Sequence, residues 1–257
     1  MQFLAPPIPR LLARRLARPF NQCRDITAKA IIVSLWLLLT CGCSSEDIEF
    51  YPLSAGRIWH YKLVKTTMDG TFEQKFIAET LPPFQWLGTS SVPLVSAGGE
   101  QYLYQHTAQA IQRVAFKPRD SIAFVAHTEP YVVLPKNQAV GNTWQQVSHT
   151  QLLENTGPPW ETLFRIAEPV TVSFSIEQND STVTVAAGTF HNCLKISGYG
   201  ESNVDVGNYI GRTTIAVNIE QWYAADVGLV QSIRTETSSS DAISHGKLMM
   251  ELEYSTN

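Results

Sequence analysis

The sequence predicts a mainly β protein, built as an antiparallel, strongly curved sheet, a sandwich or a partly open barrel. Three observations support this fold class. Apolar and polar residues alternate along many short segments after residue 50, as in half-buried strands. Gly, Asn and Asp recur between these segments at the spacing of turns. No segment has a capped helical stripe of ten residues, so the strands must pair with one another and curl, sandwich or close.

The first expected strand, residues 57–65, places Trp59 and Tyr61 on one face. Asp69-Gly70 then separates it from a second strand at residues 71–77. This dipeptide is typical of a type I′ turn, because both central turn positions need a positive φ. The sequence therefore predicts a hairpin here.

Further strands are expected along the rest of the chain. Residues 100–116 fit two strands around 106–108, because Tyr102 alternates with Tyr104 and Ile111 with Arg113. Asn179-Asp180 is expected to turn the chain between two further strands, and three long strands follow near the end. These five strands are expected at residues 170–176, 181–185, 210–222, 228–237 and 247–254.

The N-terminal residues 1–42 have the pattern of a secretory signal. Basic residues precede residues 30–39, of which only Ser34 is polar, and small residues and cysteines follow. The apolar run is shorter than the roughly 20 residues of a membrane-spanning helix. Its end, Leu39-Thr-Cys-Gly-Cys43, resembles the lipobox of bacterial lipoproteins. This resemblance implies that a cysteine is lipidated and becomes the mature N-terminus.

Two cysteines compete for the lipid. Cys43 follows Gly42, the small residue that lipoprotein cleavage favours. Cys41 has the usual leucine three positions earlier but Thr40 at the cut. We predict a leader of residues 1–42 and palmitate on Cys43, with Cys41 as the alternative and a signal without lipid as the last alternative.

The rest of the chain differs from the leader in charge. Of the 19 basic residues six lie in the leader, and of the 23 acidic residues one does, so the remainder carries a formal net charge of −9. Such an acidic body repels phosphate backbones, which argues against nucleic-acid binding. Residues 43–50 are expected to form an acidic tether and residues 51–257 a β-rich domain, with a subdivision near 155–160 left open. Only Cys193 remains in this body, so no disulfide is expected and Cys193 is interpreted as a buried apolar residue.

Three motifs of the body resemble those of a loose group of bacterial secreted and lipid-anchored proteins of unassigned function. They are Pro52-Leu-Ser-Ala-Gly-Arg-Ile-Trp-His-Tyr61, Ala187-Gly-Thr-Phe190 and Val227-Gly-Leu-Val230. The chain departs from the group at Ala186, where proline is usual, and at Ala225-Asp226, which replaces Pro-Gly. The resemblance implies a β-rich envelope domain and carries over no catalytic residue. One-sheet carriers of lipoproteins and lipids have a similar make-up, by analogy only.

Motifs that carry chemistry are absent from the sequence: it holds no Gly-x-Ser-x-Gly and no His-Glu-x-x-His. His191-x-Cys193 is half of a metal-site pattern without a second pair. Gly198-Tyr-Gly-Glu-Ser-Asn203 begins like a dinucleotide fingerprint but lacks the third glycine, and we expect a turn there. We predict no catalytic residue, no cofactor and no metal ligand. The six histidines are scattered along the chain at 60, 106, 127, 149, 191 and 245.

Tryptophans after the leader divide into two groups. Trp59, Trp144 and Trp222 lie in expected strands and are predicted to be core residues. Trp86 and Trp160 lie in proline-rich loops. Each of these two either anchors an interface or folds back over the edge of the core.

The sequence predicts a lipoprotein of the outer membrane that faces the periplasm. Ser44 follows the predicted lipid cysteine, and in the lipobox resemblance an aspartate there commonly implies retention in the inner membrane. The first expected function is non-catalytic binding or assembly with another envelope protein, and a filled core would favour it. The alternatives are a carrier or chaperone of a lipid or other apolar ligand, favoured by a large concave aromatic pocket, and a hydrolase, favoured by a pocket that gathers His, Ser or Cys with an acid.

Overall fold

The computed structural model describes residues 48–157, 162–207 and 211–256. Residues 48–257 form a compact unit of their own. The leader, Cys41, Cys43 and most of the predicted tether lie outside the described residues.

Strands make up most of the described chain, with a 3-10 turn at Asp241–Ile243. The strands of the first half are β1 (Ile58–Thr67), β2 (Gly70–Thr80), β3 (Phe84–Trp86), β4 (Thr89–Ser96), β5 (Gln101–His106), β6 (Ala110–Lys117) and β7 (Val125–Pro135). Those of the second half are β8 (Thr143–His149), β9 (Glu154–Gly157), β10 (Thr162–Arg165), β11 (Pro169–Val185), β12 (Gly188–Asp205), β13 (Arg212–Ala224), β14 (Gly228–Ser238) and β15 (His245–Thr256).

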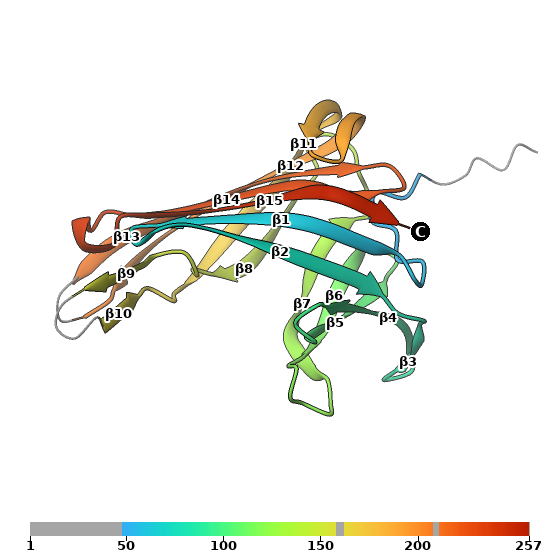
Figure 1. Ribbon diagram of the computed structural model, residues 1–257, viewed down its shortest axis with the longest axis horizontal. Coiled ribbons are helices and arrows are strands. Elements are labelled where there is room, and N and C mark those ends of the chain that lie inside the picture. The colour runs from blue at the N-terminus through green and yellow to red at the C-terminus, as the bar shows by residue number, and fades with distance from the viewer. Residues whose placement is uncertain (1–47, 158–161, 208–210, 257) are drawn as a thin grey trace, which may run out of the picture. The chain divides into compact units, whose positions relative to one another are not determined.

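One antiparallel sheet contains every strand except β9 and β10, which pair with each other. Its order is β7-β6-β5-β4-β2-β1-β15-β14-β13-β12-β11-β8, with β3 attached to β4. The N-terminal and C-terminal strands join where β1 pairs with β15. Figure 1 shows the long strands β1, β2, β14 and β15 lying side by side, while β4 to β7 cross them at one end. The predicted antiparallel β fold is confirmed, and strands from both sides of residues 155–160 belong to the same sheet.

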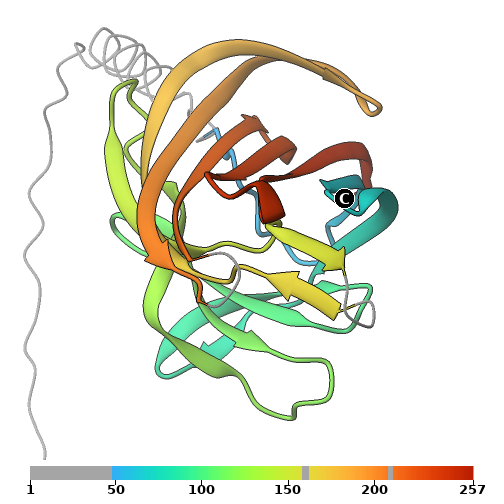
Figure 2. The same ribbon diagram turned by 90° about the vertical axis from the view of Figure 1, so that its left-hand side faces the viewer.

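The sheet is strongly curved, as seen end-on in Figure 2. Its curvature brings the two edge strands, β7 and β8, toward each other. The Val132 N–H of β7 donates a hydrogen bond to Gln146 Oε1 of β8 at 2.9 Å. Within the described residues no strand ladder joins these two edges, so the fold is a partly open barrel, one of the predicted forms.

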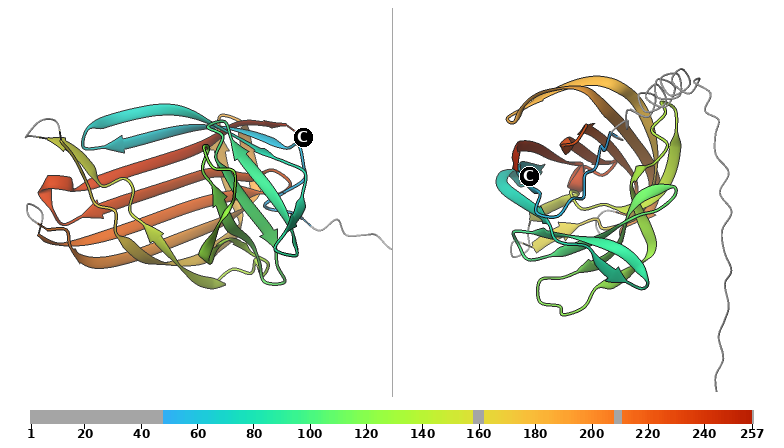
Figure 3. Two further views of the ribbon diagram at one scale, coloured as in Figure 1. Left: turned by 90° about the horizontal axis from the view of Figure 1, so that it is seen from below. Right: turned by 90° about the vertical axis from the view of Figure 1, so that its right-hand side faces the viewer.

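A segment after β8, residues 150–154, crosses the long strands on the concave face, and we call it the strap. Figures 2 and 3 show this part of the chain passing inside the curve of the sheet. Leu152 and Leu153 of the strap are buried, at 2% and 0% exposure. The strap approaches β15 closely at Gly246, where a Cβ would lie 2.2 Å from the Leu152 carbonyl oxygen. Only glycine permits this approach.

The predicted turn at Asn179-Asp180 is wrong, because both residues lie inside the 17-residue strand β11. The pairing of β11 with β12 shifts register after Ile176 and again before Ser181. The polar residues between these positions are therefore accommodated in β-bulges, which leave extra residues unpaired and bend the strand. The actual connection to β12 follows Val185, which pairs with Gly188.

The predicted turn at Gly198–Asn203 is also wrong, because these residues lie within the 18-residue strand β12. The glycines serve the close approach of β11 instead. A Cβ at Gly198 would lie 2.7 Å from the Phe174 ring, and one at Gly200 would lie 2.4 Å from the Thr171 carbonyl oxygen. Glycine inside a strand commonly marks such an approach.

The first predicted hairpin is present, but its turn is not type I′. Thr67 pairs with Gly70, so Met68 and Asp69 are the central residues. Neither has a positive φ, whereas Gly70 has a φ of 127°. The glycine therefore ends the turn rather than forming its centre.

The resemblance motifs meet in one cluster of the core. The indole Nε1–H of Trp59 donates to the Val227 carbonyl at 2.7 Å, and the Tyr61 hydroxyl donates to the Leu229 carbonyl at 2.9 Å. Ala187 and Phe190 of the second motif pack against the same hydrophobic cluster. In this chain the motif residues thus connect β1 to the segment that begins β14.

Replacing Gly246 with alanine is expected to destabilise the protein by about 3 kcal/mol, the upper part of the range for overpacking. The added methyl group would displace the Leu152 carbonyl and lift the strap from β15. The midpoint of urea-induced unfolding measures this change. Gly157→Ala is the matched control, because its Cβ would meet only the Phe164 ring at 3.9 Å. Equal midpoints for the two variants would contradict the close approach.

Candidate functional site

A cavity of about 600 Å³ lies on the concave face, with walls from β1, β2, β4 to β8 and β13 to β15. Its most frequent lining residue is tyrosine: six of the nine tyrosines of the sequence face it. Trp59 and Phe76 extend this aromatic wall. The six tyrosines are Tyr51, Tyr61, Tyr102, Tyr104, Tyr131 and Tyr223.

The tyrosines combine apolar ring faces with hydroxyl groups. The ring of Tyr51 lies 5.6 Å from that of Tyr104 and 6.2 Å from that of Tyr223, centre to centre. Burial raises the pKa of Tyr51, Tyr61 and Tyr223 above the ordinary value near 10. These hydroxyls therefore stay protonated at neutral pH and act as neutral hydrogen-bonding groups.

Arg234 lines the cavity and is fully engaged by neighbouring groups. Its Nε donates to Glu236 Oε1 at 2.6 Å. Its other nitrogens donate to Ser148 Oγ and to the His149 carbonyl, each at 2.9 Å. A carboxylate thus neutralises this guanidinium, and its donors hold the end of β8 against β14.

Arg113 also lines the cavity but has a different environment. Its guanidinium lies 5.1 Å from the ring centre of Tyr102 and 4.8 Å from that of Tyr131. Its Nε is buried and has no hydrogen-bond partner, and no carboxylate of the described residues lies within ion-pair distance. Burial lowers the pKa of His127, and the charge of Arg113 lowers it further, so these two groups repel when both are charged.

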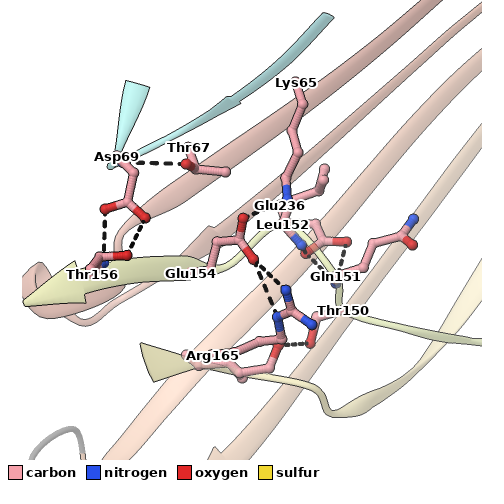
Figure 4. A network of polar contacts seen from close by, with 11 residues as sticks. Lys65, Thr67, Asp69, Thr150, Gln151, Leu152, Glu154, Thr156, Arg165 and Glu236 are labelled. Carbon is pink, nitrogen blue, oxygen red and sulfur yellow. Dashed lines mark hydrogen bonds and ion pairs between the residues drawn. The ribbon is translucent and has the colours of Figure 1, made fainter. Parts of the chain in front are cut away.

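Glu236 fixes one boundary of the cavity. The side chain is completely buried at 0% exposure. Its carboxylate accepts the Gln151 N–H at 2.9 Å and the Leu152 N–H at 2.8 Å (Figure 4). It also accepts the Nε–H of Arg234. Glu236 therefore joins the strap to β14 and places Gln151 in the cavity wall.

A second carboxylate holds the far end of the strap. Glu154 accepts from Lys65 on β1 and from Arg165 Nη2 on β10, the latter at 2.7 Å (Figure 4). Burial raises the pKa of Glu154, but the two cations lower it more, so the net pKa lies below the ordinary value of 4.5. Asp69 adds bonds to the Thr156 N–H and hydroxyl at 2.7 and 2.9 Å. Charged groups of β1, β10 and β14 thus hold the strap, and Asp69, in the turn between β1 and β2, holds β9, which follows the strap.

The side chains of His191 and Cys193 lie in different environments. Cys193 is completely buried, as predicted, and burial raises the pKa of its thiol. His191 is exposed and contacts Thr182 Oγ1 through Nδ1. Asn192 between them has a positive φ of 53°, which breaks the strand alternation. No group of three or more metal-ligating side chains occurs in the described part of the chain.

The tryptophans fall in three environments. Trp59 is a core residue, as predicted, at 4% exposure, whereas Trp144 and Trp222 are partly buried. Trp86 packs against a small cluster around Leu103 and so folds back over the core edge. Trp160 lies outside the described residues. Of the scattered histidines only His149 lines the cavity.

The sequence allowed only some of the cavity residues to be predicted. The alternations of Tyr102 with Tyr104 and of Ile111 with Arg113 predict strands. Arg113 is a cation on the same side of its strand as the apolar Ile111, and this was the signal in the sequence for a site here. The cavity itself depends on the curvature of the sheet, which places Tyr131 of β7 and Arg234 of β14 around the same cavity. No local pattern predicts this arrangement.

Comparisons with known proteins give a limited likeness. The sequence matches no known family model and no functionally curated protein. A solved structure from Bacteroides fragilis, described as an exported protein with a YmcC-like fold, aligns with 82% of this chain and all of its own, at 14% identity and a TM-score of 0.39. A solved structure from Parabacteroides distasonis, described as a lipoprotein, aligns over 81% of this chain and 99% of its own, at 14% identity and a TM-score of 0.35. Among the described residues no helix is long and apolar enough to cross a bilayer.

Glu236→Gln is expected to lower the free energy of unfolding by about 3–5 kcal/mol, the cost of breaking a buried ion pair from one side. The amide leaves Arg234 without a counter-ion and turns an NH₂ group toward backbone donors of the strap. Thermal unfolding measures the loss. Glu73→Gln is the control, because Glu73 pairs with Lys62 at the surface and its loss should leave the midpoint unchanged. A Glu236→Gln variant with the midpoint of the control would show that the strap does not depend on the charge.

Proposed function

We propose that this protein is a lipid-anchored envelope protein that binds a small, partly apolar ligand in the aromatic cavity. The cavity carries the proposal: its volume of about 600 Å³ lies within the roughly 300–1,000 Å³ usual for small-molecule sites. A core that serves only stability is packed to high density, without a space of this size. Among the functions that the sequence left open, the cavity favours the carrier over the assembly role.

The lining supports binding without catalysis. Aromatic faces give contact area at low entropic cost, and protonated tyrosine hydroxyls can orient a ligand. Ser148 and His149 line the cavity, but Arg234 already occupies the Ser148 hydroxyl and the His149 carbonyl. No aspartate or glutamate is among the described residues that line it, which favours a carrier over a hydrolase with a Ser–His–acid combination.

The anchor completes the proposal. Palmitate on Cys43, with Cys41 as the alternative, would hold the domain at the outer membrane with its cavity in the periplasm. The supports are the apolar run, the small residue Gly42 and Ser44 after the lipid cysteine. A ligand carrier in the envelope benefits from an anchor, because it keeps the cavity near the membrane that supplies or receives the ligand.

Cys43→Ser is expected to abolish labelling by a palmitate analogue in the producing cells, because the acceptor sulfur is lost. Cys41→Ser is the matched control and should label as the wild type does. In-gel detection of the label measures both. Labelling that survives in Cys43→Ser and disappears in Cys41→Ser would move the anchor to Cys41.

A ligand should co-purify with the full chain when it is extracted gently from its membrane. Native mass spectrometry should then show an added mass that collisional activation releases. Ala78→Phe fills the cavity, since Ala78 is buried in its wall, and should remove that mass. Ala123→Phe on an exposed loop is the control and should retain it. An added mass that both variants keep would place the ligand outside the cavity, against the proposal.

A further inference from the structure

Two arginines line the cavity, and they differ in whether a carboxylate pairs with them. Arg234 has Glu236 as a buried counter-ion at 2.6 Å. Arg113, on β6, instead has the ring faces of Tyr102 and Tyr131 beside its guanidinium. Burial raises the pKa of Tyr131, and the charges of Arg113 and Arg234 lower it, so both guanidinium groups lie near this side chain. Because Glu236 neutralises Arg234, the unpaired positive charge on this side of the cavity is that of Arg113.

A partly buried cation without a counter-ion is costly, because water is withdrawn from it and no opposite charge replaces that water. Cation–π contacts with two tyrosines offset part of this desolvation free energy. They do not satisfy the N–H groups, and the Nε of Arg113 remains buried without an acceptor. The missing partner is thus an acceptor that carries negative charge.

The protein itself does not supply that acceptor. The acidic group that acts on the same surroundings is Glu100, which raises the pKa of Tyr102 after the larger effect of burial, but it forms no ion pair with Arg113. The described residues that line the cavity include no carboxylate. This contrasts with the whole body, whose formal net charge after the leader is −9. An anion that enters the cavity therefore finds a local positive site inside an acidic protein.

We propose that Arg113 receives the acidic group of the ligand, and that the ligand combines one carboxylate or phosphate with an apolar or aromatic body. This inference rests on the proposed function of the cavity. The planar guanidinium matches either acid through paired N–H donors. The body of the ligand lies against the tyrosines and Trp59. The hydroxyl of Tyr61 and the indole N–H of Trp59 already donate hydrogen bonds to backbone carbonyls of the protein. The apolar faces of these residues remain available.

The test measures three soluble probes against the full chain in lipid nanodiscs by calorimetry, with empty nanodiscs subtracted. The probes are 2-naphthoate, 2-naphthyl phosphate and the uncharged 2-naphthalenemethanol. The wild type should bind at least one acid about tenfold more tightly than the alcohol, as expected for a charge-assisted contact. The tighter of the two acids identifies the acidic group as carboxylate or phosphate.

Arg113→Gln should weaken binding of the preferred acid by about tenfold and leave the alcohol unchanged. Arg113→Lys, which keeps the charge, should retain part of the difference. Arg119→Gln, in an exposed position near the end of β6, is the matched control and should bind as the wild type does. In the absence of ligand Arg113→Gln should unfold at or above the wild-type temperature, because it removes an unpaired charge.

The outcomes separate this inference from the proposed function. If acids and alcohol bind equally and Arg113→Gln changes neither, the cavity binds ligands but Arg113 does not select an acid, and the inference is wrong. If none of the probes binds the wild type or all bind Ala78→Phe unchanged, the cavity is not the binding site and the proposed function fails with the inference.

Discussion

The buried carboxylate of Glu236 is the interaction on which the arrangement of the concave face depends. It accepts two consecutive backbone N–H groups of the strap and one donor of Arg234, which are contributions from two distant parts of the chain. Through Arg234 the same group also holds the end of β8. A curved sheet with an unfilled concave face would expose its apolar side, and the strap covers one part of that face. The part that remains uncovered is the cavity.

Much of the fold follows from local signals, because alternation and turn residues report directly on strands and hairpins. Two incorrect turn predictions have one physical origin. Asn179-Asp180 and Gly198–Asn203 have the composition of turns, yet they lie within the longest strands, β11 and β12. The same residues that permit a turn also permit a bulge or a close approach, and the neighbouring strand decides between them. For the site, the strand containing Arg113 was predictable, but the absence of a counter-ion depends on side chains from other strands.

Side-chain hydrogen bonds join β1, the first strand of the sheet domain, to the start of β14, near the C-terminal end of that domain. Trp59 and Tyr61 of β1 bond to carbonyls near the start of β14, although β15 lies between these strands in the sheet. Partners 168 residues apart must meet before this contact forms. The residues of the resemblance motifs thus have a structural role, and four of them, Trp59, Tyr61, Gly228 and Leu229, also line the cavity. The same aromatic side chains thus contribute to the stability of the fold and to the wall of the cavity.

The approach of β7 and β8 has a mechanical consequence. Everywhere else around the described sheet, adjacent strands are joined by a ladder of backbone hydrogen bonds, so separating them is costly. Between β7 and β8 the Gln146 side chain bridges to Val132, and both strands contribute wall residues, Tyr131 and Val147 among them. The described sheet is therefore a partly open barrel with one gap, between β7 and β8, that no strand ladder closes. Separating β7 from β8 would widen the cavity at a lower free-energy cost than separating any other pair of neighbouring strands, because no strand pairing would be broken.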